Sequence, residues 1–457
     1  MKDNLFAQLD FGALHEYISN EDITDISYTN NGQIWLRSLT QGSYRVENPH
    51  INNATIEKLA FQCSNVMGTS FNNAHPFLDA ESPELRLNFV HESIATNGIA
   101  LVIRKTPAKI RLQEEKLLED EYITKDIHDF LMKCVYGHCN IMVCGETGSG
   151  KTEFVKYLAS HTRENEKIIT IEDTLELHLD KIYPHRDIVA MKTNNIASYS
   201  DVLVTCMRQN PKWILLSEVR SAEAVSAVRN SISSGHNILS TIHSDKASAI
   251  PHRMYSLMET DLDVDQFLNT IYRYVQLGVH IKAYYSQKHG KFHREIDEIT
   301  EFYIDDENKP VYNTIYRKWM NGKVTKKNPS KHLIDYLLAQ NIDLDNTDFE
   351  SDDDGISLET VMNGEIKEEP SSQSIEQTAT AQVVDPLTVI APKTEHVEIN
   401  NSNIESLGPE ILQDSFETLD TVPQVETLNI QPTMNMQSIN LNNNLNSTPG
   451  NVTGDIR

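Results

Sequence analysis

A glycine-rich run is the part of the chain whose residue types most directly indicate chemistry. It reads Gly145-Glu146-Thr147-Gly148-Ser149-Gly150-Lys151-Thr152 and matches the phosphate-loop pattern G-x-x-x-x-G-K-[ST] in full. Glycines let successive backbone N–H groups point inward at phosphates, where a side chain would block them. Lys151 would supply a mobile charge for the β- and γ-phosphates, and the Thr152 hydroxyl would take a Mg²⁺ position. Because an apolar strand precedes the run and a helical pattern follows it, we predict that this loop binds a nucleotide.

Three carboxylates follow the next apolar run. The segment Thr170-Ile-Glu-Asp-Thr-Leu-Glu176 places Glu172, Asp173 and Glu176 directly after a predicted strand. In an open parallel sheet, that end of a strand faces the crevice where ligands bind. The three side chains would therefore face that crevice. The alternative is a solvated, acidic start of a helix, where the helix dipole favours Asp and Glu.

A third apolar run ends in another carboxylate. Trp213-Ile-Leu-Leu-Ser-Glu-Val-Arg220 reads as a buried strand with Glu218 at its end and Arg220 just beyond it. A carboxylate at that position can polarise an attacking water or hold one of the waters of Mg²⁺. Both residues are candidates for the reaction. The alternative for Glu218 is an acidic residue at a helix N-terminus.

Two histidines stand at the ends of a fourth apolar run. The segment Gly235-His-Asn-Ile-Leu-Ser-Thr-Ile-His243 brackets a strand with His236 and His243. A lone histidine is more often structural than functional. Two histidines at the ends of one strand beside a nucleotide site make a functional role about as expected as a structural one.

The elements that must position these residues alternate between helix and strand. A helix is expected over 127–136 and strands over 140–144, 167–171, 213–216 and 237–241. This alternation is typical of a mostly parallel sheet with crossover helices. Beyond residue 277, strand-like runs at 278–284, 292–303 and 311–319 indicate an antiparallel extension, and a last helix is expected over 330–339.

The first hundred residues follow a different pattern. Residues 4–18 and 54–67 have helical periodicity, whereas alternating runs flank Asn31-Gly32, the strongest short signal for a hairpin. Strands are also expected over 85–90 and 99–104. We therefore expect an N-terminal α/β domain over 1–110, a linker over 111–124, a nucleotide-binding domain over 125–342 and a tail over 343–457.

Charge and composition exclude several classes of protein. The net charge is −26, and residues 341–457 hold 22 Asp or Glu against 3 Lys or Arg, which predicts a disordered, acidic tail. The slightly acidic remainder lacks the basic groove that direct binding of nucleic acid needs. Five cysteines, an odd number, argue against a disulfide scaffold and for a reducing compartment. No apolar stretch approaches the roughly 18 residues of a membrane-spanning helix, so we expect a cytoplasmic protein.

Taken together, these segments resemble the secretion ATPase family, the hexameric motors of type II and type IV secretion, conjugation and type IV pilus assembly. The matching pieces occur in the family's order. They are the Walker A loop, the acidic box 171–177, the Walker B run 216–224 and the histidine box 235–243, with residues 208–211 as a further family feature. The resemblance covers about residues 20–320 and implies a RecA-like P-loop NTPase domain that uses ATP and Mg²⁺.

The resemblance implies roles for the matching residues. Lys151 and Thr152 would hold phosphates and Mg²⁺, and Glu218 would be the Walker B carboxylate that activates water and holds Mg²⁺ through a water. The acidic box that positions metal or water would comprise Glu172, Asp173 and Glu176.

The remaining implied roles concern histidines and arginines. His243, and with it His236, would contact the phosphate region. Arg86 and Arg104 resemble arginines that reach the nucleotide from the N-terminal domain and neutralise charge on the γ-phosphoryl group. Their alternative is a surface ion pair.

The chain also departs from the family. Ser217 stands where the family usually has glycine before the Walker B glutamate, and Leu85 replaces a glycine often found before the first-domain arginine. The tetracysteine insertion common in type II members is absent. The short N-terminal domain and single linker resemble the type IV secretion and conjugation branch, or the tight-adherence pilus branch.

The resemblance thus implies a homo-hexameric ATPase that powers type IV secretion or conjugative transfer at the cytoplasmic face of the membrane. Its partners would be inner-membrane secretion or pilus platform proteins, and the acidic tail would be a spacer or a docking segment for a basic partner. A pilus or competence motor shares every catalytic residue and stays open. An autonomous RecA-type DNA translocase and a non-enzymatic nucleotide switch also stay open.

Overall fold

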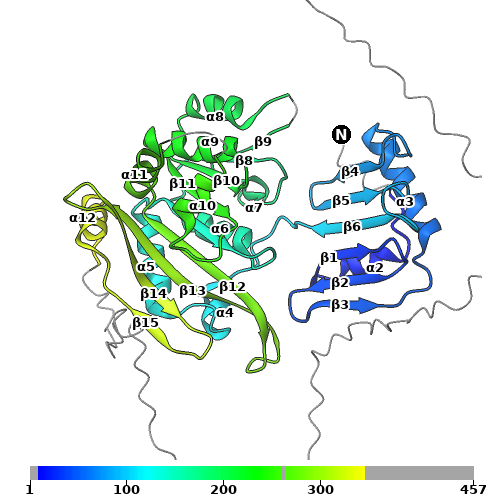
Figure 1. Ribbon diagram of the computed structural model, residues 1–457, viewed down its shortest axis with the longest axis horizontal. Coiled ribbons are helices and arrows are strands. Elements are labelled where there is room, and N and C mark those ends of the chain that lie inside the picture. The colour runs from blue at the N-terminus through cyan, green and yellow to red at the C-terminus, as the bar shows by residue number, and fades with distance from the viewer. Residues whose placement is uncertain (1–8, 195, 259–262, 345–457) are drawn as a thin grey trace, which may run out of the picture. The chain divides into compact units, whose positions relative to one another are not determined.

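The computed structural model describes residues 9–194, 196–258 and 263–344. The chain divides into two compact units, Met1–Glu365 and Ile366–Arg457, of which the second lies wholly outside the described residues. The tail predicted to be disordered, residues 343–457, therefore lies outside the described part, except for residues 343 and 344. The described part contains two β-sheets, one of six strands and one of nine (Figure 1).

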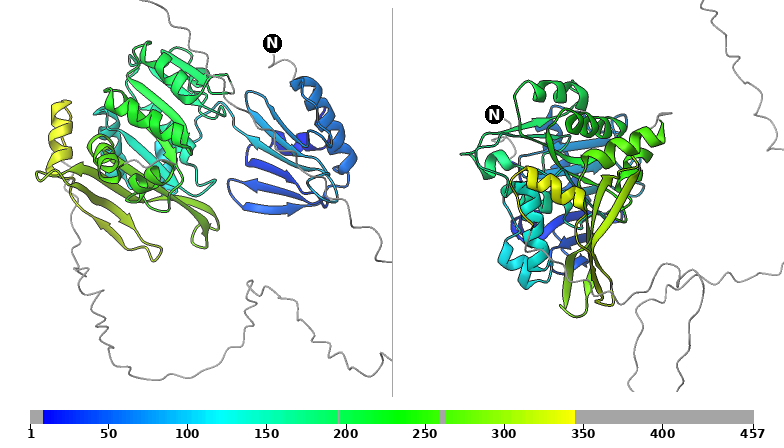
Figure 2. Two further views of the ribbon diagram at one scale, coloured as in Figure 1. Left: turned by 45° about the horizontal axis from the view of Figure 1, so that its top comes forward. Right: turned by 90° about the vertical axis from the view of Figure 1, so that its left-hand side faces the viewer.

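The six-stranded sheet forms the N-terminal lobe. Its order is β3-β2-β1-β6-β5-β4, and every neighbouring pair is antiparallel. The strands are β1 (Ile23–Tyr28), β2 (Ile34–Ser38), β3 (Gly42–Val46), β4 (Phe77–Glu81), β5 (Leu85–Val90) and β6 (Ala100–Lys105). Helices α2 (Leu14–Ser19) and α3 (Asn53–Met67) cover one face (Figure 2), where they share one apolar core with alternate residues of the strands.

The predicted elements of this lobe form with one correction. The hairpin at Asn31-Gly32 joins β1 to β2, and Gly32 adopts a φ of +81° that suits glycine in a tight turn. Within the described part of the helix expected over 4–18, residues 9–13 are not helical and α2 begins at Leu14. Gly12 has a φ of +51°, which interrupts a right-handed helix. Residues 4–8 lie outside the described part.

A connecting segment follows β6. It contains a short helix, α4 (Glu114–Glu119), within the range predicted as a linker. Leu117 of α4 and Tyr122 are buried in the core of the next lobe, so the end of the segment packs as part of that lobe. The exact domain boundaries stay a prediction.

The nine-stranded sheet forms the second lobe, with the order β15-β14-β13-β12-β7-β11-β10-β8-β9. The pairs from β12 to β9 are parallel, and those from β12 to β15 are antiparallel. Its strands are β7 (Ile141–Gly145), β8 (Ile168–Glu172), β9 (Ile188–Lys192), β10 (Trp213–Val219), β11 (Asn237–Ile242), β12 (Leu277–Ser286), β13 (Lys291–Ile304), β14 (Pro310–Lys318) and β15 (Val324–Lys326). Strands β9 and β15 were not expected from the sequence.

Helices pack on both faces of this sheet. One core contains α5 (Lys125–Tyr136), α6 (Lys151–Ser160), α7 (Leu179–Ile182) and α12 (Lys331–Ala339). The other contains α8 (Tyr199–Met207), α9 (Ala222–Ser233), α10 (Ile250–Ser256) and α11 (Val264–Tyr274). Burial on both faces explains why the central strands read as continuous apolar runs. The predicted fold class is confirmed: a mostly parallel α/β sheet follows a small α/β lobe.

This topology gathers the ends of four strands. The phosphate loop follows β7, Glu172 ends β8, Glu218 lies near the end of β10, and His243 follows β11. Parallel pairing places the carboxyl ends of these strands at one edge of the sheet.

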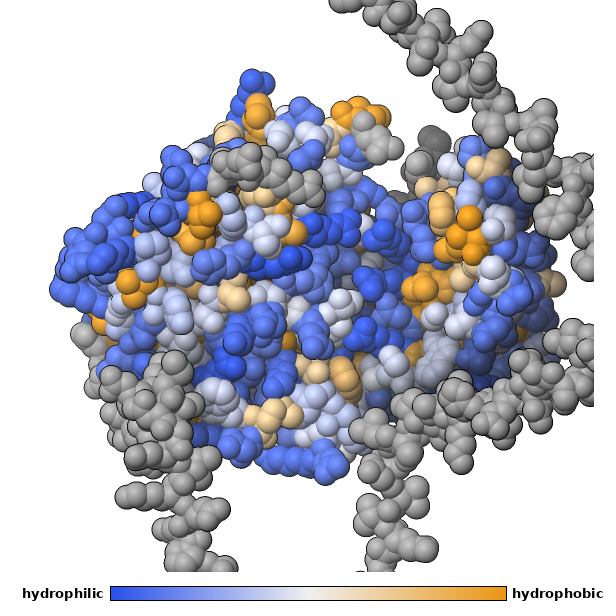
Figure 3. Space-filling view, in the orientation of Figure 1, coloured by the Kyte–Doolittle hydropathy of each residue, from blue (hydrophilic) through white to orange (hydrophobic). Residues whose placement is uncertain are grey.

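The surface of the second lobe is mainly polar on the face that Figure 3 draws, with apolar side chains in small groups. No helix within the described ranges is both long and apolar enough to cross a membrane.

Candidate functional site

The phosphate loop has the backbone that its glycines permit. Gly145, Gly148 and Gly150 have φ values of +144°, +78° and +96°. A Cβ on Gly145 would lie 2.4 Å from the carbonyl oxygen of Ile281, and one on Gly148 would lie 2.1 Å from a guanidinium nitrogen of Arg37. The positive φ values favour glycine at all three positions, and at Gly145 the backbone of Ile281 also leaves no room for a side chain.

Lys151 begins α6 and is held inside the loop. Its side chain is 7% exposed, and its Nζ donates to the carbonyl oxygens of Gly145 at 3.1 Å and Glu146 at 2.9 Å. Burial lowers the pKa of this ammonium, while the carboxylate of Glu218 opposes the shift. The Ser149 hydroxyl is buried with no hydrogen-bond partner. A partly desolvated cation beside an unsatisfied hydroxyl fits the phosphate ligand predicted for the loop.

Thr152 and two carboxylates offer oxygen atoms next to this loop. The Thr152 hydroxyl donates to Oε2 of Glu176 at 3.2 Å, and both residues line the same cavity as Glu218. Burial raises the pKa of Glu176, although Arg104 and the Thr152 hydroxyl act in the opposite sense. Hydroxyl and carboxylate oxygens are the ligands that Mg²⁺ prefers. The residues present thus fit the predicted metal.

Glu172 has a different environment from the other acidic residues. Its side chain is fully buried, and Oε1 accepts the backbone N–H groups of Glu176 and Leu177, each at 3.0 Å. Burial raises its pKa to about 7 in spite of these two bonds. A solvated helix start is therefore the wrong interpretation for Glu172, since it lies inside the protein and the next helix begins only at Leu179. Its contacts hold the turn that carries Glu176.

Asp173 and Arg220 form an ion pair with each other. They follow β8 and precede α9, respectively, and neither lines the cavity of the phosphate loop. The structure brings these two predicted residues together but leaves them beside the site.

Glu218 and His243 meet at the ends of β10 and β11. The Oε1 atom of Glu218 lies 2.8 Å from Nε2 of His243, whose Nδ1 is 3.5 Å from Nζ of Lys151. Burial and the nearby Lys151 lower the pKa of His243, with Glu218 opposing them. A neutral imidazole follows, with Nε2–H donating to the carboxylate and Nδ1 facing the ammonium; we assign this tautomer from the partners.

His236 is not brought to this site. It precedes β11 and its Nδ1 lies 2.9 Å from the Ser234 hydroxyl, whereas His243 follows β11. A strand of this length separates its ends by about 20 Å. The expectation that His236 contacts the phosphate region is therefore wrong within this chain. Both ends of a strand cannot reach a ligand at one edge of a parallel sheet.

The predicted arginines stand on the open face of the six-stranded sheet, on neighbouring strands. Arg104 lines the cavity, and its Nε donates to Oδ1 of Asp25 at 3.0 Å. Burial opposes its charge, but Asp25, then Glu176 and Glu218, together raise its pKa. Arg86 instead donates from Nη1 to the Thr174 hydroxyl at 2.9 Å and lies outside the cavity lining. Arg104 is thus both an ion-pair partner and a neighbour of the carboxylates.

The cavity has a volume of about 350 Å³, within the range of small-molecule sites. Both lobes and the connecting segment line it. Sequence reasoning missed several of its residues, namely Arg37, Arg111, Tyr122, Phe292 and Arg294. One signal was available: Arg37 alternates with buried Leu36 on a predicted strand, which places it on the open face.

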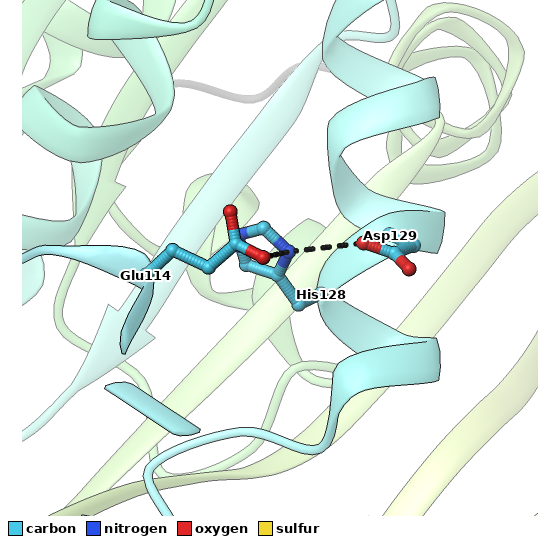
Figure 4. Close-up of side chains that lie close together, drawn as sticks. All are labelled: Glu114, His128 and Asp129. Atoms are coloured by element: carbon cyan, nitrogen blue, oxygen red, sulfur yellow. Dashed lines mark hydrogen bonds and ion pairs between the residues drawn. The ribbon is translucent and has the colours of Figure 1, made fainter. Parts of the chain in front are cut away.

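A separate group of polar side chains links α4 to α5. Figure 4 shows Glu114, His128 and Asp129 converging, with Nδ1 of His128 3.3 Å from Oδ1 of Asp129 and 3.9 Å from Oε1 of Glu114. The Lys125 ammonium already contacts both carboxylates. Because this ammonium already offsets part of the negative charge of the cluster, we assign the cluster to packing of the connecting segment.

Comparison with known proteins agrees with the site. The family model described as "Type II/IV secretion system protein" matches residues 79–307. An uncharacterised protein of Bacillus anthracis is 30% identical over 57% of this chain and 59% of its own length. The type IV secretion system protein VirB11 of Bartonella quintana is 32% identical over 48% of this chain and 64% of its own length.

The chain therefore spans about three fifths of the length of these two relatives. Among solved structures, the VirB11 ATPase of the Brucella suis type IV secretion system, in complex with sulphate, is 22% identical, with a TM-score of 0.34, and the match covers 65% of this chain and 94% of that one. The family match includes the phosphate loop, the acidic box, both strand-end residues of the site and Arg104, over half of the chain. This chain belongs to the type II/IV secretion system protein family.

Proposed function

We propose that this protein is a hexameric ATPase that powers type IV secretion or conjugative transfer from the cytoplasmic face of the membrane. The observation that carries the proposal is the convergence of Lys151, Glu218 and His243 with Arg104, which comes from another lobe, around one cavity. The family match supports the same activity.

Different groups of the chain would have different roles in the hydrolysis of ATP. Backbone N–H groups of the loop and Lys151 would bind the phosphates. Thr152 and, through a water, Glu218 would hold Mg²⁺, which supplies charge neutralisation at phosphate oxygens. Glu218 would also orient the attacking water and accept its proton, while neutral His243 keeps that carboxylate in place. Arg104 would neutralise the charge that develops on the γ-phosphoryl group.

Motion would follow from the position of the cavity. Several contacts join the lobes, including those of Arg86 with Thr174 and of Lys192 with Glu81. ATP would draw the lobes together and its hydrolysis would release them, by rotation about the connecting segment. In a ring of six, this movement would act on inner-membrane secretion or pilus platform proteins. The acidic tail is proposed as a spacer or as a docking segment for a basic partner.

The first test is hydrolysis by the purified full chain. We expect Mg²⁺-dependent release of phosphate from ATP that Lys151→Ala abolishes, because no other described side chain replaces its charge inside the loop. Lys331→Ala is the matched control, since that lysine is 84% exposed on α12 and pairs only with Asp335.

Two outcomes would contradict the proposal. Unchanged turnover in Lys151→Ala would remove the assigned site. Strong, salt-sensitive stimulation of turnover by added DNA would favour a DNA translocase over a secretion motor.

A further inference from the structure

Three arginines of the cavity lack a carboxylate partner. Arg37 comes from β2, Arg111 from the connecting segment and Arg294 from β13, and all three line the cavity beside the phosphate loop. Within the described ranges, every ion pair between an arginine and a carboxylate involves an arginine other than these three. Arg104 on the same cavity differs, because Asp25 neutralises it.

The hydrogen bonds of Arg37 and Arg294 go to uncharged carbonyl oxygens. Carboxylates act on Arg294 and Arg111 only without a direct ion pair, from Asp22 and Glu21, respectively. Arg37 donates from Nη2 to the carbonyl oxygen of Thr147 at 3.1 Å, and Arg294 donates from Nη1 to that of Leu39 at 3.1 Å. The Nε atom of Arg111 is buried and has no partner. Neutral carbonyl groups satisfy donors but cannot balance a full positive charge.

Two of the arginines lie directly against the phosphate loop. A Cβ on Gly148 would lie 2.1 Å from Nη2 of Arg37, and one on Gly150 would lie 3.6 Å from Cδ of Arg294. The third is close enough to interact with them. Burial lowers the pKa of Arg294, and repulsion from Arg37 and Arg111 adds to the effect, whereas Tyr122 and Asp22 oppose it.

The same arginines lie where the two lobes touch. The backbone N–H of Phe292 donates to the carbonyl oxygen of Thr40 at 2.6 Å, next to the bond from Arg294 to Leu39. The start of β13 thus meets the turn between β2 and β3, while Arg37 of β2 meets the phosphate loop. A ligand that binds all three arginines would therefore contact both lobes and the segment between them.

Three like charges in a partly desolvated cavity repel one another, and Lys151 lies nearby. Five carboxylates line the same cavity, but each of them contacts another side chain. They are Asp25, Asp120, Glu153, Glu176 and Glu218. Such a group of arginines is stabilised by a ligand with several negative charges. Guanidinium groups match phosphate oxygens through paired N–H donors, which a lysine ammonium does not provide.

We propose that Arg37, Arg111 and Arg294 form a polyphosphate-binding cluster that grips the phosphate chain of the bound nucleotide from both lobes at once. This inference rests on the proposed function, because the nucleotide is its ligand. It adds binding residues beyond the phosphate loop and Arg104 of β6. It also predicts that the contact between the two lobes depends on the number of phosphates on the nucleotide.

The test is a comparison of nucleotides with one, two and three phosphates. Affinities of AMP, ADP and a non-hydrolysable ATP analogue are measured by calorimetry for the full chain and for Arg37→Gln, Arg111→Gln and Arg294→Gln. We expect each substitution to weaken binding of the triphosphate roughly tenfold or more, as for loss of a charged hydrogen bond, and to weaken binding of AMP far less. The dependence of affinity on salt should also become shallower. Arg45→Gln is the matched control, because this arginine of β3 is exposed and pairs with Glu47.

A purely structural role gives a different result. It would lower the melting temperature of the nucleotide-free protein and weaken all three nucleotides equally, which would overturn the proposal. If the three guanidinium groups repel one another, each Gln variant should have an unchanged or higher melting temperature without nucleotide. Addition of the triphosphate should then raise the melting temperature of the variant less than that of the wild type.

The Lys151→Ala variant separates this inference from the proposed function. If it loses triphosphate affinity while the three arginine variants retain theirs, the cluster is wrong and the nucleotide site stands. If Lys151→Ala also binds normally, the nucleotide site itself is wrong.

Discussion

The two sheets bring their charged side chains to the cavity in different ways. In the nine-stranded lobe, Lys151, Glu218 and His243 follow the ends of parallel strands and already contact one another or the loop. In the six-stranded lobe, Arg37 and Arg104 stand on the open face of an antiparallel sheet. Under the proposed function, the nine-stranded lobe would hold the reaction centre, and the six-stranded lobe would add arginines that line the same cavity. We therefore expect changes in the first to affect chemistry and changes in the second to affect its control.

The largest effect is expected from Glu218→Gln. The amide keeps the size of the side chain but cannot accept a proton from water, so kcat should fall about 10³-fold. Binding of ATP should change little, because Lys151 and the loop remain. Steady-state phosphate release and equilibrium binding measure the two quantities. If Glu218→Gln lost binding of ATP without a loss of kcat, it would contradict the expectation that changes in the nine-stranded lobe affect chemistry.

Arg104→Ala should lower kcat on the order of 10²-fold. This is less than for a free arginine finger, because Asp25 already holds part of the charge of Arg104. Asp25→Asn is the informative companion, since it frees Arg104 and should preserve or raise kcat. Equal losses in both variants would mean that the ion pair only supports the sheet.

Glu172→Gln should change how stability depends on pH. The folded protein keeps a proton on Glu172 up to a pKa of about 7, above the usual value of 4.5 for a glutamate. Between these values the folded state binds more protons than the unfolded state, so the wild type loses stability as pH rises from about 4.5 to 7. The Gln variant should lack this loss, roughly 2–3 kcal/mol.

Urea unfolding at pH 5 and pH 8 checks this expectation. Gln retains an oxygen that can accept the N–H groups of Glu176 and Leu177, so the turn should survive. Glu164→Gln is the control, because Glu164 is exposed. Parallel pH profiles for the wild type and Glu172→Gln would show that Glu172 is already ionised in the folded state.

The smallest effect is expected at the rim of the lobe contact. Lys192 and Glu81 form an ion pair between the lobes, and both side chains are partly exposed. Solvent screens such pairs, so Lys192→Ala should cost less than about 1 kcal/mol of stability. Its effect on kcat should be far below that of Arg104→Ala. A large loss of kcat would assign this pair to the control of lobe closure.

Much of the nine-stranded lobe could be predicted because its signals are local. The phosphate loop is a continuous run, and an apolar strand that ends in a polar residue places that residue at a known edge of a parallel sheet. The same reasoning was incomplete for His236, since a pattern of two histidines around a strand does not say which end faces the ligand. It also missed β9, whose residues are half-buried at the edge of the sheet.

Burial separated residues that look alike in the sequence. Glu172 and Glu176 both belong to the acidic box, yet one is enclosed by the protein and the other lines the cavity. Arg86 and Arg104 lie on neighbouring strands, but only Arg104 reaches the cavity. Sequence patterns report strand ends and faces, whereas the exposure of a side chain depends on segments that are distant in the chain.

The amino-acid sequence by itself determined that a phosphate loop, a carboxylate at a strand end and a histidine belong to one parallel sheet. Their spacing along the chain is enough to identify all three. Only the tertiary structure decided that Arg37, Arg111 and Arg294 line one cavity, where none of them forms an ion pair with a carboxylate of the described residues. These three residues come from a hairpin, a connecting segment and a late strand. Electrostatic repulsion acts through space, so their common charge becomes significant only when folding brings them together.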